Sequence, residues 1–225
     1  AFHDVFTYLV QPPSVFGLRQ EFLASSRLDN LSSVHAGLVA LENLAGTETD
    51  AAVFVAFDHE EVGSGTRSGA GGPFLQDVLH GLAAVMGFVG DGERALLARS
   101  SCISADAGHS VHPNYGQLHD PQVRPLINHG PLLKINARQR YATDAVGGAI
   151  WKRACRAAGV PTQDFVSNNS VPCGTTIGPI TASRLGITTV DVGIALLSMH
   201  SAREMCGVED GPYLARALHA YWAEN

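Results

Sequence analysis

The stretch VFVAFDHEEVGS, residues 53–64, decides how the rest of the chain is interpreted. Its first five residues are apolar, with β-branched and aromatic side chains around one alanine. Such a run is typical of an interior parallel strand that is buried on both faces. It is followed by Asp58, His59, Glu60 and Glu61. Because open α/β sheets carry their chemistry just beyond the carboxyl ends of strands, Glu60 and Glu61 form the first candidate site. The alternative is a solvated loop after a strand.

The composition is typical of a globular protein and excludes several classes of partner. With 225 residues, 45% of them hydrophobic, the chain can form one large domain or two small ones around a buried core. A net charge of −6 without a block of lysine or arginine argues against nucleic acid or an anionic membrane surface as the main partner. No apolar run approaches the roughly 20 residues that span a bilayer, and the first residues do not resemble a signal peptide.

The cysteines indicate a reducing compartment. They are widely separated and show no CxxC spacing, which fits reduced thiols in small core positions and predicts a cytoplasmic protein. The four are Cys102, Cys155, Cys173 and Cys206.

Strand-like and helix-like patterns alternate along the chain, which predicts an α/β domain with three layers, α/β/α. Besides residues 53–57, the expected core strands cover residues 101–105, 131–136 and 188–195, and residues 1–24 and 161–171 contain shorter extended pieces. Helical spacing predicts helices at residues 31–44, 74–89, 144–158 and 180–185, a polar turn at 47–50, and a C-terminal helical region that begins at 196–204 and ends in 211–223.

Polar residues follow several of these elements at their ends. The strand at 101–105 runs into Asp106 and His109, Asp29 stands at the start of the helix at 31–44, and His200 follows the last core strand. Each has an ordinary alternative role. Asp29 could accept a hydrogen bond as a helix N-cap, and scattered acidic residues are often surface charge. Lys134 alternates with apolar neighbours, so by default it is expected to be a solvent-facing lysine on a strand.

Carboxylate and imidazole groups without thiolates suit zinc, manganese or cobalt. One carboxylate can bridge two such ions roughly 3.5–4 Å apart. A further carboxylate beside the metals can take a proton from water, so the adjacent Glu60 and Glu61 could divide the roles of base and ligand. Asp106, Asp29 and His200 are the other candidates for such a site.

Six segments resemble the successive motifs of the aspartyl aminopeptidase family of dinuclear zinc exopeptidases, and they come in the family's order. They are RLDN at 27–30, DHEEVGS at 58–64, SADAGHSVHPNY at 104–115, KINARQRY at 134–141, PCGTTIGP at 172–179 and SMHSARE at 198–204. The resemblance covers most of the chain. It implies an α/β/α sandwich around a mixed, largely parallel sheet, and a metal-dependent enzyme that hydrolyses peptide bonds.

The resemblance also implies roles at the metal site. Asp29 would bridge two divalent ions, Asp106 would bind one of them, and Glu61 with His200 would bind the other. Glu60 would be the general base. The ions would be zinc, with cobalt or manganese as alternatives.

For the substrate, the family implies peptides with an N-terminal Asp or Glu. Lys134 and Tyr141 match positions associated with substrate recognition, and a lysine ammonium is a suitable partner for an acidic side chain. His112 and the loop that contains Gly174 would line the substrate pocket. Family members also tend towards large homo-oligomers.

Two departures from the family pattern bear on these expectations. The family's first metal ligand, a histidine, and its inserted dimerisation domain lie upstream of anything in this sequence, and His3 is a poor substitute for that ligand. Residues 1–225 are therefore expected to form the C-terminal part of a catalytic domain. The alternatives are a related co-catalytic metallopeptidase of different specificity, or a non-catalytic assembly or cargo protein that keeps the fold.

Overall fold

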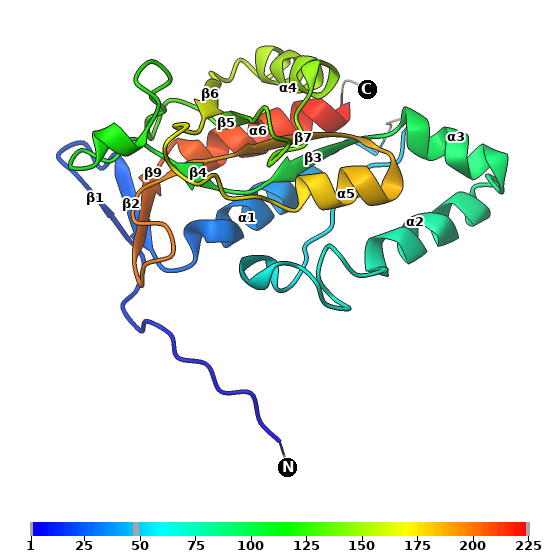
Figure 1. Cartoon of the computed structure of the whole chain (residues 1–225), viewed down its shortest axis with the longest axis horizontal. Coiled ribbons are helices and arrows are strands. Elements are labelled where there is room, and N and C mark those ends of the chain that lie inside the picture. The colour runs from blue at the N-terminus through cyan, green and yellow to red at the C-terminus, as the bar shows by residue number, and fades with distance from the viewer. Residues whose placement is uncertain (1, 47–49, 224–225) are drawn as a thin grey trace.

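Four strands form the central sheet of the computed structural model, which describes residues 2–46 and 50–223 (Figure 1). In spatial order they are β3 (Ser101–Ala105), β7 (Thr188–Gly193), β5 (Leu132–Ile135) and β6 (Gln163–Val166). β3 runs parallel to β7 and β5 runs parallel to β6, whereas β5 and β7 are antiparallel. The sheet is therefore mixed, as expected, and the predicted strands at 101–105, 131–136 and 188–195 are confirmed.

Helices cover both faces of this sheet. α6 (Asp210–Ala223) packs against α1 (Leu28–Glu42) and α4 (Ala145–Ala157), and α4 also contacts β7. α5 (Gly178–Leu185) contacts β7 as well and lies in front of the sheet in Figure 1, with α6 behind it. The main core lies between the sheet and helices α1, α4 and α6. It includes Trp151, Val190, Val192, Ile194, Leu196 and Leu214. This is the predicted α/β sandwich.

Two smaller sheets bring distant parts of the chain together. β1 (Ser14–Phe16), β2 (Phe22–Ser25) and β9 (Glu204–Gly207) form an antiparallel sheet, in which Ser25 lies opposite Glu204. β4 (Gly108–His109) pairs with β8 (Ala195–Leu196) in parallel. As a result, the segment that enters α1 lies beside the turn that enters β9.

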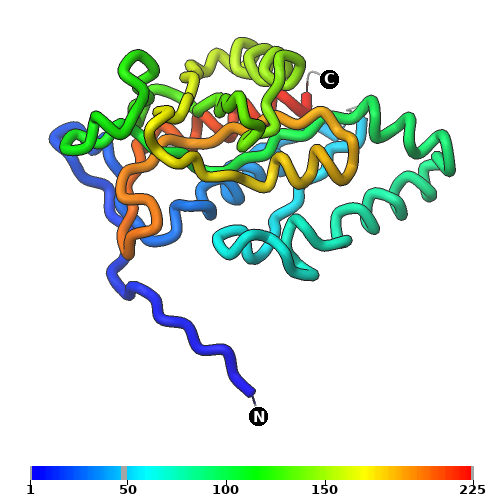
Figure 2. Tube along the Cα trace, in the orientation of Figure 1, coloured from blue at the N-terminus to red at the C-terminus, as the bar shows by residue number. Residues whose placement is uncertain are grey.

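The remaining elements lie at the periphery. α2 (Phe74–Val85) and α3 (Asp91–Arg99) pack on each other and extend from the body, as does the chain before β1 (Figure 2). The helix predicted at 74–89 ends earlier because Gly87 and Gly90 adopt positive φ angles of 83° and 58°. Two short 3₁₀ turns, η1 (Glu60–Val62) and η2 (Gly116–Leu118), complete the described elements. No helix in the described part is long and apolar enough to cross a membrane.

The buried strand expected at residues 53–57 is wrong. The structure has no strand there, and Val53 is exposed. The Phe54 side chain instead packs against α1, where a Cβ built on Gly37 would lie 2.5 Å from the Phe54 ring. Five apolar residues can also form an irregular segment that packs against a helix, and no described strand pairs with this segment in a ladder.

The start of the C-terminal helical region was also predicted wrongly. Residues 196–204 contain the end of β8, a turn and the start of β9. Ser198 and His200 have φ angles of 58° and 65°, which an α-helix cannot accommodate. The helix at 211–223 is confirmed as α6. The polar turn predicted at 47–50 falls almost entirely outside the described residues.

Candidate metal centre

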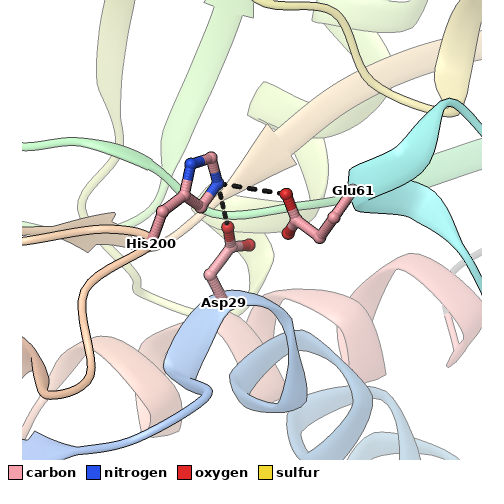
Figure 3. A group of neighbouring side chains, drawn as sticks. All are labelled: Asp29, Glu61 and His200. Atoms are coloured by element: carbon pink, nitrogen blue, oxygen red, sulfur yellow. Dashed lines mark hydrogen bonds and ion pairs between the residues drawn. The ribbon is translucent and has the colours of Figure 1, made fainter.

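Three predicted ligands from separate parts of the chain converge on one point (Figure 3). His200 Nε2 lies 3.1 Å from Asp29 Oδ2 and 3.1 Å from Glu61 Oε2. One ligand atom from each residue lies within 4.8 Å of the other two. Asp29 comes from the start of α1, Glu61 from η1 and His200 from the turn before β9. This arrangement is the core of the candidate site.

Asp29 is positioned by an interruption of the helix. Asp29 and Asn30 have non-helical backbone angles, and the Asn30 side chain donates to the Ala105 carbonyl at 2.8 Å. The N-cap alternative for Asp29 is wrong, because α1 begins without a side-chain cap and the Asp29 carboxylate points to His200. Although the Asp29 side chain is only 4% exposed, its Oδ1 has no hydrogen-bond partner among the described residues. A buried, unpartnered carboxylate oxygen is well suited to a cation.

Glu60 and Glu61 lie on a tight turn and face different surroundings. His59 and Gly63 flank the turn with φ angles of 64° and 96°. Glu61 is exposed and reaches His200, whereas Glu60 is half-buried. Burial, and then the negative charges of Asp106 and Glu61, raise the pKa of Glu60 to about 7. A carboxyl group with this pKa can exchange a proton near neutral pH.

Asp106 lies next to the cluster and is held by Lys134. Asp106 Oδ2 accepts a hydrogen bond from Lys134 Nζ at 3.1 Å, and the same ammonium donates to the Ala107 carbonyl at 2.8 Å. Lys134 is 2% exposed, so the expectation that it faces solvent is wrong. Its strand, β5, is buried on both faces, and the ammonium is satisfied by an ion pair instead of water.

A glycine lets Asp106 approach the end of β7. A Cβ built on Gly193 would lie 1.7 Å from the Asp106 carbonyl oxygen. A side chain at this position would therefore displace Asp106, so the close contact between the end of β3 and the end of β7 requires glycine.

The carboxylates of the site create an unfavourable concentration of negative charge that a bound cation would relieve. Asp29, Glu60, Glu61 and Asp106 act on one another, and Lys134 is the cation placed among them. The donor set of carboxylates and one imidazole fits zinc.

Because of the negative charge gathered at the site, the stability of the metal-free protein should depend on pH. Burial is the main cause that raises the pKa of Asp29 to about 8, followed by the charges of Asp106 and Glu61. Because unfolded carboxyls titrate near pH 4 (about 3.9–4.3), the folded state binds more protons than the unfolded state between about pH 4 and 8. We expect the melting temperature of the metal-free protein to fall as pH rises through this window.

Calorimetric melts from pH 5 to 8, with and without zinc, measure this effect. Zinc favours the charged carboxylates, so it should raise the melting temperature most at pH 8. The Asp29→Asn variant should show a flatter pH dependence without zinc. A metal-free melting temperature that rises from pH 5 to 8 would contradict this account of the site.

Of the predicted substrate residues, Tyr141 is linked to the cluster through Lys134, whereas no hydrogen bond or ion pair among the described residues joins His112 or Gly174 to it. Tyr141 is buried beside Phe165, and its ring lies 5.4 Å from Lys134 Nζ. Gly174 is exposed on a loop whose neighbouring residues bond to Arg140. The contacts of His112 lie within its own loop, where it accepts a hydrogen bond from the Asn114 backbone N–H.

Sequence reasoning missed one residue near the site. Glu204 bonds to the backbone of both Asp29 and His200, and only its place inside the motif SMHSARE marks it in the sequence. His109, which follows the strand at 101–105 together with Asp106, also lies near the site. Burial lowers its pKa first, and the charges of His119, His200 and Lys134 lower it further, so its imidazole is held towards the neutral form.

Comparisons with known proteins agree on one family. A sequence model of the aminopeptidase I zinc metalloprotease family (M18) matches residues 2–222. A probable M18 family aminopeptidase 2 of Streptomyces coelicolor is 51% identical over 221 residues, which are 97% of this chain and 51% of the relative. The chain thus spans about half the length of the curated relatives it matches.

Solved structures give the same result. The crystal structure of prApe1 superposes with a TM-score of 0.90 at 32% identity and covers 96% of this chain and 47% of that one. The mApe1 dodecamer of S. cerevisiae superposes with a TM-score of 0.81 at 29% identity, and the match covers 96% of this chain and 50% of that one.

Proposed function

Because the chain belongs to the aminopeptidase I zinc metalloprotease family (M18), we propose that it is the metal-binding part of an aminopeptidase that removes the first residue of peptides. The observation that supports this most strongly is the convergence of Asp29, Glu61 and His200, with Glu60 beside them. We further propose that residues 1–225 belong to one catalytic domain.

We assign the metal ligands as follows. Asp29 would bridge two zinc ions, Glu61 and His200 would complete the site of one ion, and Asp106 would bind the other. The unpartnered Oδ1 of Asp29 supports a bridging role, since its Oδ2 already faces His200. When bound, the ions would polarise the peptide carbonyl and lower the pKa of the attacking water.

Glu60 would act as the general base. It would accept a proton from the water that attacks the first peptide carbonyl, and it would donate that proton to the departing amine. Its raised pKa, about 7, and its half-buried position suit a group that must both take and release a proton. Lys134 would hold Asp106 in place through the 3.1 Å ion pair.

We propose that the first residue of the substrate is acidic. Lys134 is the lysine beside the cluster, where its ammonium pairs with Asp106 and lies 5.4 Å from the centroid of the Tyr141 ring. An ammonium is the kind of partner that an acidic side chain requires. The dodecamer formed by the related mApe1 supports a homo-oligomer. The four free cysteines, two of them buried and two half-buried, are consistent with a cytoplasmic location, which stays part of the proposal.

A panel of aminoacyl 4-nitroanilides tests the specificity with the full-length, zinc-loaded protein. We expect kcat/KM for Asp and Glu to exceed that for the nearly isosteric Asn and Gln by about 10-fold or more, since a neutral amide forms no ion pair with the ammonium. In the Lys134→Met variant the ratio of Asp to Asn should fall. This ratio cancels any effect of the substitution on Asp106.

The outcomes of this panel separate the alternatives. Preference for neutral substrates would leave a metallo-aminopeptidase of another specificity. Stoichiometric zinc without hydrolysis of any substrate would indicate a protein that keeps the fold for a non-catalytic purpose, and would refute the proposed reaction.

A further inference from the structure

Glu204 is a buried carboxylate that bonds to the backbones of two residues of the candidate metal centre, Asp29 and His200. It is the first residue of β9, opposite Ser25 at the end of β2, and it is 2% exposed. Its Oε2 accepts a hydrogen bond from the Asp29 backbone N–H at 2.9 Å. Its Oε1 accepts one from the His200 backbone N–H at 2.8 Å. Both oxygens are therefore used, one for each segment.

The two segments that Glu204 joins are far apart in sequence and have irregular backbones. Asp29 and Asn30 interrupt the start of α1, and His200 has a positive φ angle of 65°. Neither segment can rely on helix or strand hydrogen bonds at these residues. Since the Asp29 and His200 side chains must meet within 3.1 Å, their main chains need a fixed separation. One carboxylate that accepts from both N–H groups supplies it.

We propose that Glu204 is a positioning residue, which sets the spacing of Asp29 and His200 for metal binding without contacting the ion. This inference rests on the proposed metal centre. A glutamine cannot replace Glu204, because its NH₂ group would face one of the two backbone N–H donors. An aspartate is one methylene shorter and cannot reach both. Partners that orient metal ligands in this way commonly contribute 10- to 100-fold to metal affinity.

A second buried carboxylate provides a matched control. Asp210 is also fully buried, and it accepts from the backbone N–H groups of Asn128, at 2.9 Å, and Gly207, at 2.9 Å. Like Glu204, it joins two segments that are far apart in sequence. Unlike Glu204, it bonds to neither Asp29 nor His200. A role in general folding should affect both residues alike, whereas a role in metal positioning should belong to Glu204 alone.

The test measures zinc affinity and fold separately in the full-length protein. Zinc dissociation constants of wild type, Glu204→Gln and Asp210→Asn are measured by competition with a chromogenic chelator. The metal-free proteins are compared by circular dichroism, thermal melts and amide hydrogen exchange. We expect Glu204→Gln to weaken zinc binding by about 10- to 100-fold. The Asp29 and His200 amides should lose protection from exchange. Asp210→Asn should lower the melting temperature at unchanged zinc affinity.

Two results would overturn the inference. One is wild-type zinc affinity in folded Glu204→Gln. The other is equal loss of affinity in both variants, in proportion to their loss of fold, which would make Glu204 a general structural residue. If Glu204→Gln does not fold, Glu204→Asp is measured in the same way and the same results apply. Failure of the metal centre itself is distinguishable, because wild type would then bind no zinc.

Discussion

Replacing Glu60 with glutamine should lower kcat by about 10²- to 10⁴-fold in the full-length enzyme while its zinc content stays the same. Glutamine has almost the same shape but cannot accept a proton from water. Glu60 lies beside the convergent cluster of Asp29, Glu61 and His200 and is not a member of it, so its loss should leave the ligands in place. Steady-state kinetics on an acidic substrate, with zinc measured by mass spectrometry, provides the readout.

The matched control is Glu42→Gln, an exposed glutamate at the end of α1, which should behave as wild type. Two results would refute the assignment of Glu60. Activity that survives the substitution would show that another group is the base. A protein that loses zinc together with activity would show that Glu60 is a ligand.

Replacing Asp29 with asparagine should weaken zinc binding by more than about 100-fold, which is beyond the range for residues that only orient a ligand. An amide keeps the size of the side chain and removes its charge. Asp29 is the buried member of the cluster, and its unpartnered Oδ1 and the His200 contact through Oδ2 both depend on the carboxylate. Chelator competition and isothermal calorimetry measure the change directly.

The control for this variant is Asp91→Asn, because Asp91 is an exposed acid in the first turn of α3. It should leave zinc affinity unchanged. Metal-free Asp29→Asn should also be more stable than metal-free wild type at pH 8, because a neutral amide replaces a buried carboxylate that repels Asp106. Unchanged zinc affinity in Asp29→Asn would show that the cluster does not hold the metal.

Local patterns predicted most of the fold but misplaced the segment that seemed most informative. The strand at 101–105 and the helices α4 and α6 are recognisable because their apolar spacing and their neighbours agree. The run at 53–57 has the same apolar composition as a buried strand. In the described fold no strand pairs with it in a ladder, and a single sequence carries no information about such pairing.

In the candidate site, too, the sequence identified some residues correctly and predicted the environment of another wrongly. The resemblance to the family's motifs named Asp29, Glu61 and His200, and the structure brings these three together. Lys134 was expected to face solvent, because alternation with apolar residues suggests a strand with one exposed face. Both faces of β5 are covered, so the lysine turns to Asp106.

Glu204 could not be predicted because its role depends on two backbone N–H groups, which belong to every residue alike. Its partners, Asp29 and His200, become its neighbours only when β2 pairs with β9.

An anomalous-scattering map of crystals of the full-length protein soaked with zinc tests the proposed centre most directly. We expect two peaks at the site, with Asp29 between them, Glu61 and His200 on one ion and Asp106 on the other, at Zn–O and Zn–N distances of about 2.0–2.2 Å. Zinc peaks elsewhere on the molecule, with none within bonding distance of Asp29, Glu61 and His200, would contradict it.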